Sequence, residues 1–275
     1  MVVGESSTGP ILDVSELTLS FGGVDVLQGV DLLVNTGDIV GVIGPNGAGK
    51  SAMLNCISGV YRSNGGAILL DGQPIQDMRP HRIASLGIAR SFQHLELFPR
   101  LSLIENLLIA RDHLMSAGAI ASALWWGPAR AEDARQREVA EAMIDFFELS
   151  PYRNKPVGSL AYGTQKLVGV ARALSAEPRL LLLDEPGGGM TREEREDLAR
   201  FLLRVRARMD IAMLWVEHDI QLVTDLSDRV IALDFGRVIA DGEPNWVRHH
   251  PEVEVAYLGA NLDADPSPQK GSSDA

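Results

Sequence analysis

The sequence predicts an α/β fold in which helices cover a largely parallel β-sheet. Short apolar strands alternate along the chain with longer segments of helical periodicity, and this alternation is typical of parallel sheets. One strand runs into a glycine-rich loop, and a later strand ends in two adjacent carboxylates. Both segments lie where a predicted strand ends, so the candidate site is expected there.

The elements follow one another in a simple order. Strands separated by turns occupy residues 11–43, and an alanine-rich helical insertion covers about residues 100–160. The predicted strands are 17–21, 26–34, 39–43, 65–72, 87–92, 179–183, 212–216, 230–233 and 238–240. The predicted helices outside the insertion are 52–57, 79–86, 165–174, 192–208 and 220–226. We expect one domain over residues 11–260, preceded by the segment 1–10 and followed by a disordered tail, residues 261–275, which lacks an apolar face.

The glycine-rich loop follows the buried strand 39–43 and precedes a predicted helix. Its glycines let backbone N–H groups converge on phosphates, and the helix N-terminus adds its positive end. We expect Lys50 to reach the β- and γ-phosphates and the Ser51 hydroxyl to ligate Mg²⁺. An ordinary glycine-rich turn is the alternative, but the flanking strand and helix favour a nucleoside triphosphate site. Its predicted residues are Gly44, Pro45, Asn46, Gly47, Ala48, Gly49, Lys50, Ser51 and Ala52.

Two carboxylates follow the apolar strand 179–183. Asp184 is expected to be a second Mg²⁺ ligand, and Glu185 is expected to polarise the attacking water as a general base. A strand end capped by acidic residues is the alternative interpretation. The phosphate-binding loop upstream favours the catalytic one.

Composition limits the possible functions. Of the 275 residues, 45% are hydrophobic, so the chain can bury a substantial core. The net charge of −12 and the pI of about 4.9 argue against a nucleic-acid partner, which requires a basic face. Cys56 is the only cysteine, which excludes an internal disulfide; we expect it to be buried and unreactive. No signal peptide or membrane-length apolar run is present, so a soluble, cytoplasmic protein is expected.

Several further motifs follow the phosphate loop in a fixed order. They are Gln93, the helical insertion, the segment Leu160-Ala161-Tyr162-Gly163-Thr164-Gln165, the two carboxylates and Glu217-His218-Asp219. This order resembles that of the nucleotide-binding subunits of ABC transporters over residues 11–259. Within the family, the chain is most similar to the ATPases of branched-chain amino acid importers, and it also resembles those of urea and amide importers. The segments that carry this closer resemblance are 91–94, 97–98, 104–108, 160–163, 217–219 and 256–259.

The resemblance implies a P-loop NTPase fold of the ABC type, with an antiparallel β subdomain and a helical subdomain. It also implies that Phe21 stacks on adenine, although packing of Phe21 in the core is an alternative. Gln93 would sense Mg²⁺ and the attacking water, unless it is only an exposed loop residue. His218 would contact the γ-phosphate, unless it is structural. The signature segment, residues 160–165, would contact ATP bound to a second subunit.

The implied function is ATP hydrolysis that powers uptake of branched-chain amino acids or a related small polar solute, with ATP and Mg²⁺ as cofactors. The implied partners are a second ABC ATPase subunit, identical or different, and transmembrane permease subunits; a periplasmic or extracellular solute-binding protein would act indirectly. The protein would lie at the inner face of the cell membrane. A regulatory protein that uses ATP binding as a conformational switch is the alternative. A nucleic-acid or repair ATPase is disfavoured by the acidic charge and by the lack of a coiled-coil insertion or zinc-ligand spacing.

Two segments depart from the family pattern. In the signature segment, Thr164 replaces the first glutamine and Ala161 has no hydroxyl for a phosphate. After Pro186, three glycines, 187–189, replace Ala-Ala-Gly, and Thr191 replaces the expected Asn or Asp. We expect the glycines to loosen this loop, which would cross a dimer interface. The pair Trp125-Trp126 is expected to pack the insertion onto the main domain, with a partner contact as the alternative.

Overall fold

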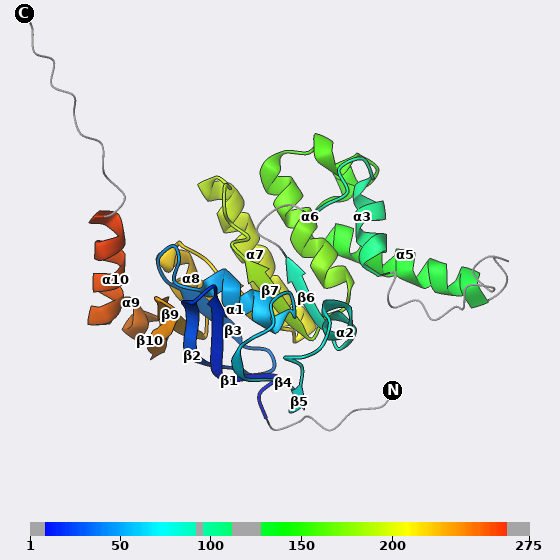
Figure 1. The fold of residues 1–275 in the computed structure, drawn as a ribbon. Helices are drawn as coiled ribbons and strands as arrows, with labels where there is room; N and C mark the ends of the chain where they lie inside the picture. The colour runs from blue at the N-terminus through cyan, green and yellow to red at the C-terminus, as the bar shows by residue number, and fades with distance from the viewer. Residues whose placement is uncertain (1–8, 92–95, 112–127, 263–275) are drawn as a thin grey trace, which may run out of the picture.

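A six-stranded sheet forms the framework of the protein (Figure 1). The computed structural model describes residues 9–91, 96–111 and 128–262. The strand order is β10-β9-β3-β8-β7-β6, and all neighbours are parallel except the antiparallel pair β9 and β10. The strands are β3 (Ile39–Ile43), β6 (Ile88–Ser91), β7 (Leu180–Asp184), β8 (Ala212–Val216), β9 (Arg229–Asp234) and β10 (Arg237–Gly242). The predicted largely parallel sheet is thus present.

The central strands of this sheet are buried on both faces. Every residue of β3, β7 and β8 is buried, which is why these strands are continuous apolar runs in the sequence. Successive side chains of a strand point to opposite faces. In β7, Leu181 and Leu183 therefore pack into one hydrophobic core, and Leu180 and Leu182 into the other.

A smaller antiparallel sheet lies over one face. It has the order β2-β1-β4-β5, with β1 (Leu12–Phe21), β2 (Val24–Val34), β4 (Gly65–Leu70) and β5 (Gln73–Pro74). Its apolar side chains share a core with β3, β7 and helix α1 (Lys50–Ile57). The antiparallel subdomain expected from the family resemblance is therefore present.

Helices cover the other face and form a separate group beside the sheets (Figure 1). Phe147, which follows α5, packs on Phe201 of α7 with ring centroids 5.1 Å apart, so the helical group is anchored to the main domain through this pair. The helices after α1 are α2 (Pro80–Ser85), α3 (Leu103–Ala110), α5 (Pro128–Phe146), α6 (Tyr162–Ser175), α7 (Arg192–Met209) and α8 (Ile220–Leu226). Two short 3₁₀ turns, Ser150–Tyr152 and Val157–Ser159, lead into α6.

The C-terminal part differs from the expectation. Two helices that were not predicted, α9 (Pro244–Arg248) and α10 (Pro251–Leu262), lie at the end of the molecule opposite α5 (Figure 1). Helix α10 continues to Leu262, two residues into the segment 261–275 that the sequence predicts as a tail, and the rest of that segment lies outside the described residues. Within the described residues, no helix combines the length and the apolar character that crossing a membrane requires.

Candidate nucleotide-binding site

The glycine-rich loop connects β3 to α1 and wraps around its own lysine. Gly44, Gly47 and Gly49 have φ values of 152°, 84° and 102°, which side chains other than glycine rarely tolerate. A Cβ at Gly44 would lie 2.2 Å from a backbone carbonyl oxygen of β9. The ammonium of Lys50 donates hydrogen bonds to the carbonyls of Gly44 and Pro45, at 2.7 and 2.9 Å. The loop is therefore a backbone cradle that only glycines can form.

Helix α1 begins at Lys50, two residues before the expected start at Ala52. Its N-cap is Gly49, which provides no side-chain hydrogen bond. The first N–H groups of a helix have no acceptor within the helix, so an uncapped N-terminus at the end of a glycine loop suits a phosphate group. Asn46 and Gly47 are exposed at the tip of the loop, whereas Ala48 is buried beneath it.

Two predicted metal ligands lie side by side. The Ser51 hydroxyl donates to Oδ1 of Asp184 at 3.1 Å, although 133 positions separate them in the sequence. Oδ2 of Asp184 pairs with the guanidinium of Arg90 at 2.6 Å, and both side chains are almost completely buried. The same guanidinium donates to Asn55 and Ser58 at the C-terminal end of α1. A hydroxyl beside a carboxylate is an oxygen donor set that fits Mg²⁺.

Opposing charges surround the buried ammonium of Lys50. Burial lowers the pKa of Lys50, and the carboxylates of Glu185 and Asp184 act in the opposite direction. The ammonium of Lys50, after β3, therefore lies near the two carboxylates at the end of β7, of which Asp184 is also paired with the buried Arg90.

Glu185 is held from two sides. Its backbone has a φ of 47°, and its Oε1 lies 2.5 Å from Nε2 of His218. The ammonium of Lys166, from α6, donates to the Glu185 carbonyl at 3.2 Å. The structure thus brings together Glu185 and His218, which the sequence analysis singled out separately.

The three glycines after Pro186 have neighbours that limit which side chains could replace them, and the expected looseness of this loop stays a prediction. A Cβ at Gly187 would lie 2.9 Å from Oε1 of Glu217, whose carboxylate accepts the Gly187 N–H at 2.7 Å. Gly189 has a φ of 77°, and a Cβ there would lie 2.9 Å from the ring of Tyr162. Close approach at Gly187 and a left-handed backbone at Gly189 explain why glycine occupies these positions.

Thr191, the other departure in this loop, is the N-cap of α7. Its hydroxyl accepts the Glu194 N–H at 3.2 Å, and the Glu194 carboxylate accepts the Thr191 N–H at 2.8 Å. This reciprocal capping box is also available to other short polar residues. Threonine therefore supplies the capping hydrogen bond that Asn or Asp would supply.

The signature segment forms the start of α6, which begins at Tyr162 rather than at the expected residue 165. Ala161 is the N-cap and makes no side-chain hydrogen bond, as expected for a residue without a hydroxyl. Gly163 is buried, and a Cβ there would lie 2.2 Å from the Glu194 carboxylate. Leu160 is also buried and accepts a 2.8 Å hydrogen bond from the side chain of Gln165, while Thr164 is partly exposed.

Phe21 lies at the end of β1 with 49% of its surface exposed, so the core-packing alternative is wrong. Its ring meets Tyr61 edge-on, with centroids 5.2 Å apart. An exposed aromatic ring is available for stacking, which stays a prediction. Gln93 and the pair Trp125-Trp126 lie outside the described residues. Cys56 is buried, as expected, and burial raises its pKa to about 11.

Four residues around the site received no role from the sequence. Arg90 and Lys166 reach Asp184 and Glu185, and Glu217 reaches Gly187. The Tyr257 hydroxyl of α10 accepts the Gly44 N–H at 2.7 Å, and burial raises the pKa of Tyr257 to about 12. Glu217 carried a local signal, because a charged residue directly after a fully apolar strand is unusual, and Tyr257 lies in one of the segments that carry the family resemblance.

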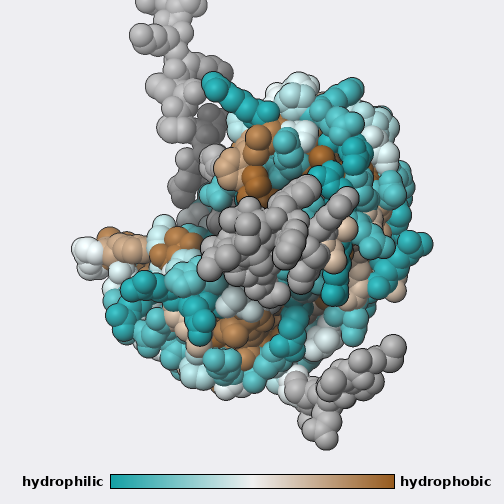
Figure 2. Space-filling view, turned by 90° about the vertical axis from the view of Figure 1, so that its right-hand side faces the viewer, coloured by the Kyte–Doolittle hydropathy of each residue, from teal (hydrophilic) through white to brown (hydrophobic). Residues whose placement is uncertain are grey.

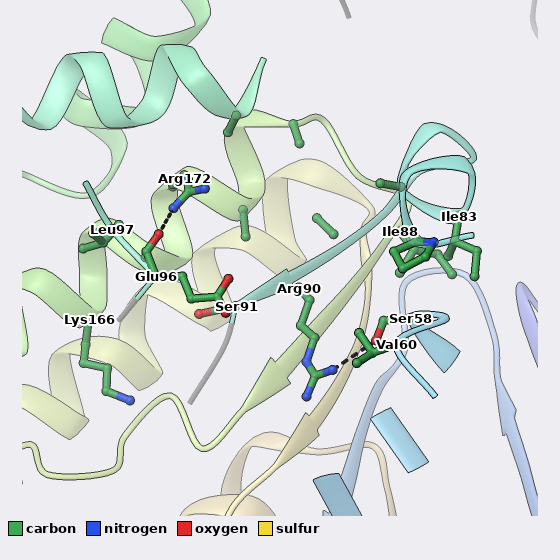
Figure 3. Close-up of a pocket in the computed structure, with 17 residues that line it drawn as sticks. Ser58, Val60, Ile83, Ile88, Arg90, Ser91, Glu96, Leu97, Lys166 and Arg172 are labelled. Atoms are coloured by element: carbon green, nitrogen blue, oxygen red, sulfur yellow. Dashed lines mark hydrogen bonds between the residues drawn. The ribbon is translucent and has the colours of Figure 1, made fainter. Parts of the chain in front are cut away.

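A cavity of about 310 Å³ lies beside the site, between β6, α2 and α6 (Figure 3). Apolar side chains such as Ile83 and Ile88 line one side, and Arg90, Lys166 and Arg172 supply cationic groups. The Arg172 guanidinium donates to the carbonyl of Glu96 at the edge of this cavity. Figure 2 looks onto the side of the molecule that carries α5 and shows hydrophobic patches enclosed by hydrophilic surface.

Comparison with known proteins agrees with this geometry. A family model described as ABC transporter matches residues 27–188. The high-affinity branched-chain amino acid transport ATP-binding protein BraF of Pseudomonas aeruginosa is 38% identical over 250 residues, which cover 91% of this chain and 98% of BraF. The high-affinity branched-chain amino acid transport ATP-binding protein LivG of Escherichia coli (strain K12) is 35% identical over 250 residues, which cover 91% of this chain and 98% of LivG. The solved ADP conformation of MJ1267, an ATP-binding cassette of an ABC transporter, has a TM-score of 0.80 at 30% identity and covers 92% of this chain and 100% of that chain.

These matches confirm the predicted fold class and the family resemblance, and they favour the transport interpretation over the regulatory one. In the structure, the Lys50 ammonium lies against the carbonyls of the glycine-rich loop, and Ser51 contacts Asp184; their roles toward a nucleotide stay predictions. The chain belongs to the ABC transporter family and is one of its ATP-binding and ATP-hydrolysing subunits.

Proposed function

We propose that the protein powers the import of branched-chain amino acids or of a related small polar solute such as an amide or urea. The single observation that supports this choice is the match along nearly the whole chain to ATP-binding proteins of high-affinity branched-chain amino acid transport. The solute contacts other subunits, so the chemistry of this chain concerns ATP alone.

Nucleotide binding is assigned to the loop between β3 and α1. The N–H groups at the start of α1 bind the phosphates, Lys50 moves its hydrogen bonds from the loop carbonyls to the β- and γ-phosphates, and Phe21 stacks on adenine. Ser51, Asp184 and Gln93 would hold Mg²⁺, which neutralises phosphate charge when bound. The 3.1 Å contact between Ser51 and Asp184 supports this donor set.

Hydrolysis is assigned to Glu185 and His218. Glu185 accepts a proton from the attacking water, while His218 orients the carboxylate and contacts the γ-phosphate. The 2.5 Å separation between the imidazole and the carboxylate supports their joint action. Gln93 is proposed to position the same water.

Two further proposals concern partners. A second ATPase subunit, identical or different, provides the uncapped start of its α6 to the nucleotide bound here. Permease subunits dock at the cavity between β6, α2 and α6, because its apolar walls lie next to the exposed Glu96 and the partly exposed Arg172. The protein would then be peripheral at the inner face of the cell membrane, and a solute-binding protein would act only through the permease.

The Glu185→Gln variant tests the hydrolytic assignment. The amide keeps the shape but cannot accept the proton, so we expect Mg²⁺-dependent hydrolysis to fall at least about a hundredfold while ATP affinity is retained. The matched control is Glu193→Gln, the same change at an exposed position on α7, which should hydrolyse ATP normally. Undiminished turnover of Glu185→Gln would contradict the assignment.

Uptake measurements test the transport assignment. In cells that lack the gene, uptake of labelled leucine should be lost and should return with the wild-type gene but not with the Glu185→Gln variant. Parallel uptake of a short amide and of urea identifies the solute class. Unchanged uptake of all three solutes would contradict the proposed import function.

A further inference from the structure

Glu217 connects two segments of the site that come from different strands. It follows β8 directly, and only 4% of its surface is exposed. Its Oε1 accepts the N–H of Gly187 at 2.7 Å, and its Oε2 accepts the N–H of His218 at 3.2 Å. One carboxylate therefore joins the glycine loop after β7 to the histidine after β8.

The burial of this carboxylate has an energetic cost. Removal from water raises the pKa of Glu217, and the hydrogen bonds from Gly187 and His218 act in the opposite direction. A buried carboxylate destabilises a fold unless it is hydrogen-bonded, and residues that merely fill a core are apolar. The charge at Glu217 thus has a geometric use: it offers two acceptors to two backbone donors.

The fit around Glu217 is close. A Cβ on Gly187 would lie 2.9 Å from Oε1, so even the smallest side chain would displace the carboxylate. On the other side, His218 lies 2.5 Å from Glu185. A shift of Glu217 therefore moves both the loop and the imidazole that orients Glu185.

We propose that Glu217 is a positioning residue for ATP hydrolysis, which fixes the loop 187–189 and His218 in one arrangement. The proposal rests on the roles proposed above for Glu185 and His218. A displacement of the loop by a second subunit is transmitted through Glu217 to His218, and so to the group that activates water. The hydrogen bonds of the Glu217 carboxylate go to Gly187 and His218, so we expect its substitution to affect hydrolysis more than ATP binding.

Two substitutions separate the two hydrogen bonds. Glu217→Gln keeps one acceptor oxygen and satisfies only one of the two N–H groups, whereas Glu217→Ala satisfies neither. We expect kcat to fall about tenfold in the first variant and about a hundredfold in the second, with the KM for ATP changed less than about twofold. The measurements are steady-state hydrolysis and nucleotide affinity of the full-length protein. Gly187→Ala should lower kcat as well. The fold loss of kcat in the double variant Gly187→Ala/Glu217→Gln should be smaller than the product of the two single losses.

Asn106→Ala is the matched control. Asn106 is fully buried in α3 and hydrogen-bonds to the backbone at Phe98 and Ser102, away from the nucleotide site. We expect this variant to lose thermal stability but to keep the kcat of its folded fraction.

Three results would overturn the proposal. Wild-type kcat in Glu217→Ala would show that the contacts do not affect the reaction. An equal change in KM and kcat would indicate general damage to the site. A loss of kcat in the double variant equal to the product of the two single losses would show that Glu217 and Gly187 act separately. Wild-type hydrolysis by Glu185→Gln would instead refute the underlying site assignment, so the two failures can be told apart.

Discussion

Helices α6 and α7 begin side by side, but their N-termini are capped differently. A Cβ on Gly163 of α6 would lie 2.2 Å from the Glu194 carboxylate of α7, so the two N-termini are in contact. Helix α7 is closed by the reciprocal hydrogen bonds between Thr191 and Glu194. Helix α6 begins at Ala161 without a side-chain cap.

This contrast separates a supporting helix from one that serves a ligand. Each α-helix starts with N–H groups that need an acceptor from outside the helix. In α7, the chain supplies the acceptors. The N-cap residues of α6 and α1, Ala161 and Gly49, make no side-chain hydrogen bond. The first N–H groups of these two helices are therefore proposed to bind an anion. The uncapped first turns of α1 and α6, each next to a glycine, are therefore the features that support the proposed phosphate binding.

The largest expected effect is at α1. Lys50→Ala removes the buried cation that faces the bound phosphates, and we expect ATP binding to weaken by about 2–4 kcal/mol, as measured by calorimetry. Lys155→Ala, at an exposed lysine beside Tyr152, is the control and should bind ATP normally. Unchanged ATP affinity in Lys50→Ala would contradict the proposal that the start of α1 binds the phosphates.

The next effect concerns α6. Gly163→Ala forces a methyl group against Glu194, so we expect hydrolysis to fall about a hundredfold while binding of ATP to the single subunit is kept. Gly169→Ala, on the same helix, places its Cβ 3.8 Å from the nearest atom and should have little effect. Equal hydrolysis by the two variants would show that the start of α6 takes no part in the reaction.

The sequence predicted the parts of the site that local pattern encodes. The buried strands β3 and β7 are apolar runs followed by a glycine loop and by carboxylates, so their ends were predicted. Ser51 and Asp184, each predicted as a Mg²⁺ ligand, lie in contact there. The partners Arg90 and Lys166 were not found, because a single cation within an element of mixed composition shows no periodicity. Their roles depend on tertiary contacts with Asp184 and Glu185.

The C-terminal helices were missed for a similar reason. Helix α10 leaves Val255 and Leu258 exposed, at 67% and 65%, so its apolar and polar residues do not separate into two faces. Tyr257 is fixed by the N–H of Gly44, more than two hundred residues earlier. The sequence predicts looseness at the three glycines after Pro186, but it cannot show the close neighbours that explain why glycine occupies positions 187 and 189.

A smaller effect is expected at the cap of α7. Thr191→Ala removes the capping hydroxyl, and we expect the free energy of unfolding to fall by about 1 kcal/mol, with ATP affinity unchanged. Thr191→Asn keeps a capping oxygen and should be as stable as the wild type. Chemical denaturation measures both. A loss of ATP affinity in Thr191→Ala would contradict the assignment of α7 as a supporting helix.

The smallest effect is expected from giving α6 the cap that it lacks. Ala161→Ser adds a hydroxyl at the N-cap, and we expect the free energy of unfolding without nucleotide to rise by about 0.5 kcal/mol, because one first-turn N–H gains an acceptor. Hydrolysis should change less than about threefold, since the Gly163 N–H is still available. Denaturation with and without ATP measures the difference. An unchanged free energy of unfolding would mean that the first N–H groups of α6 already have acceptors. Helices α6 and α7 would then differ only in whether a side chain supplies the cap.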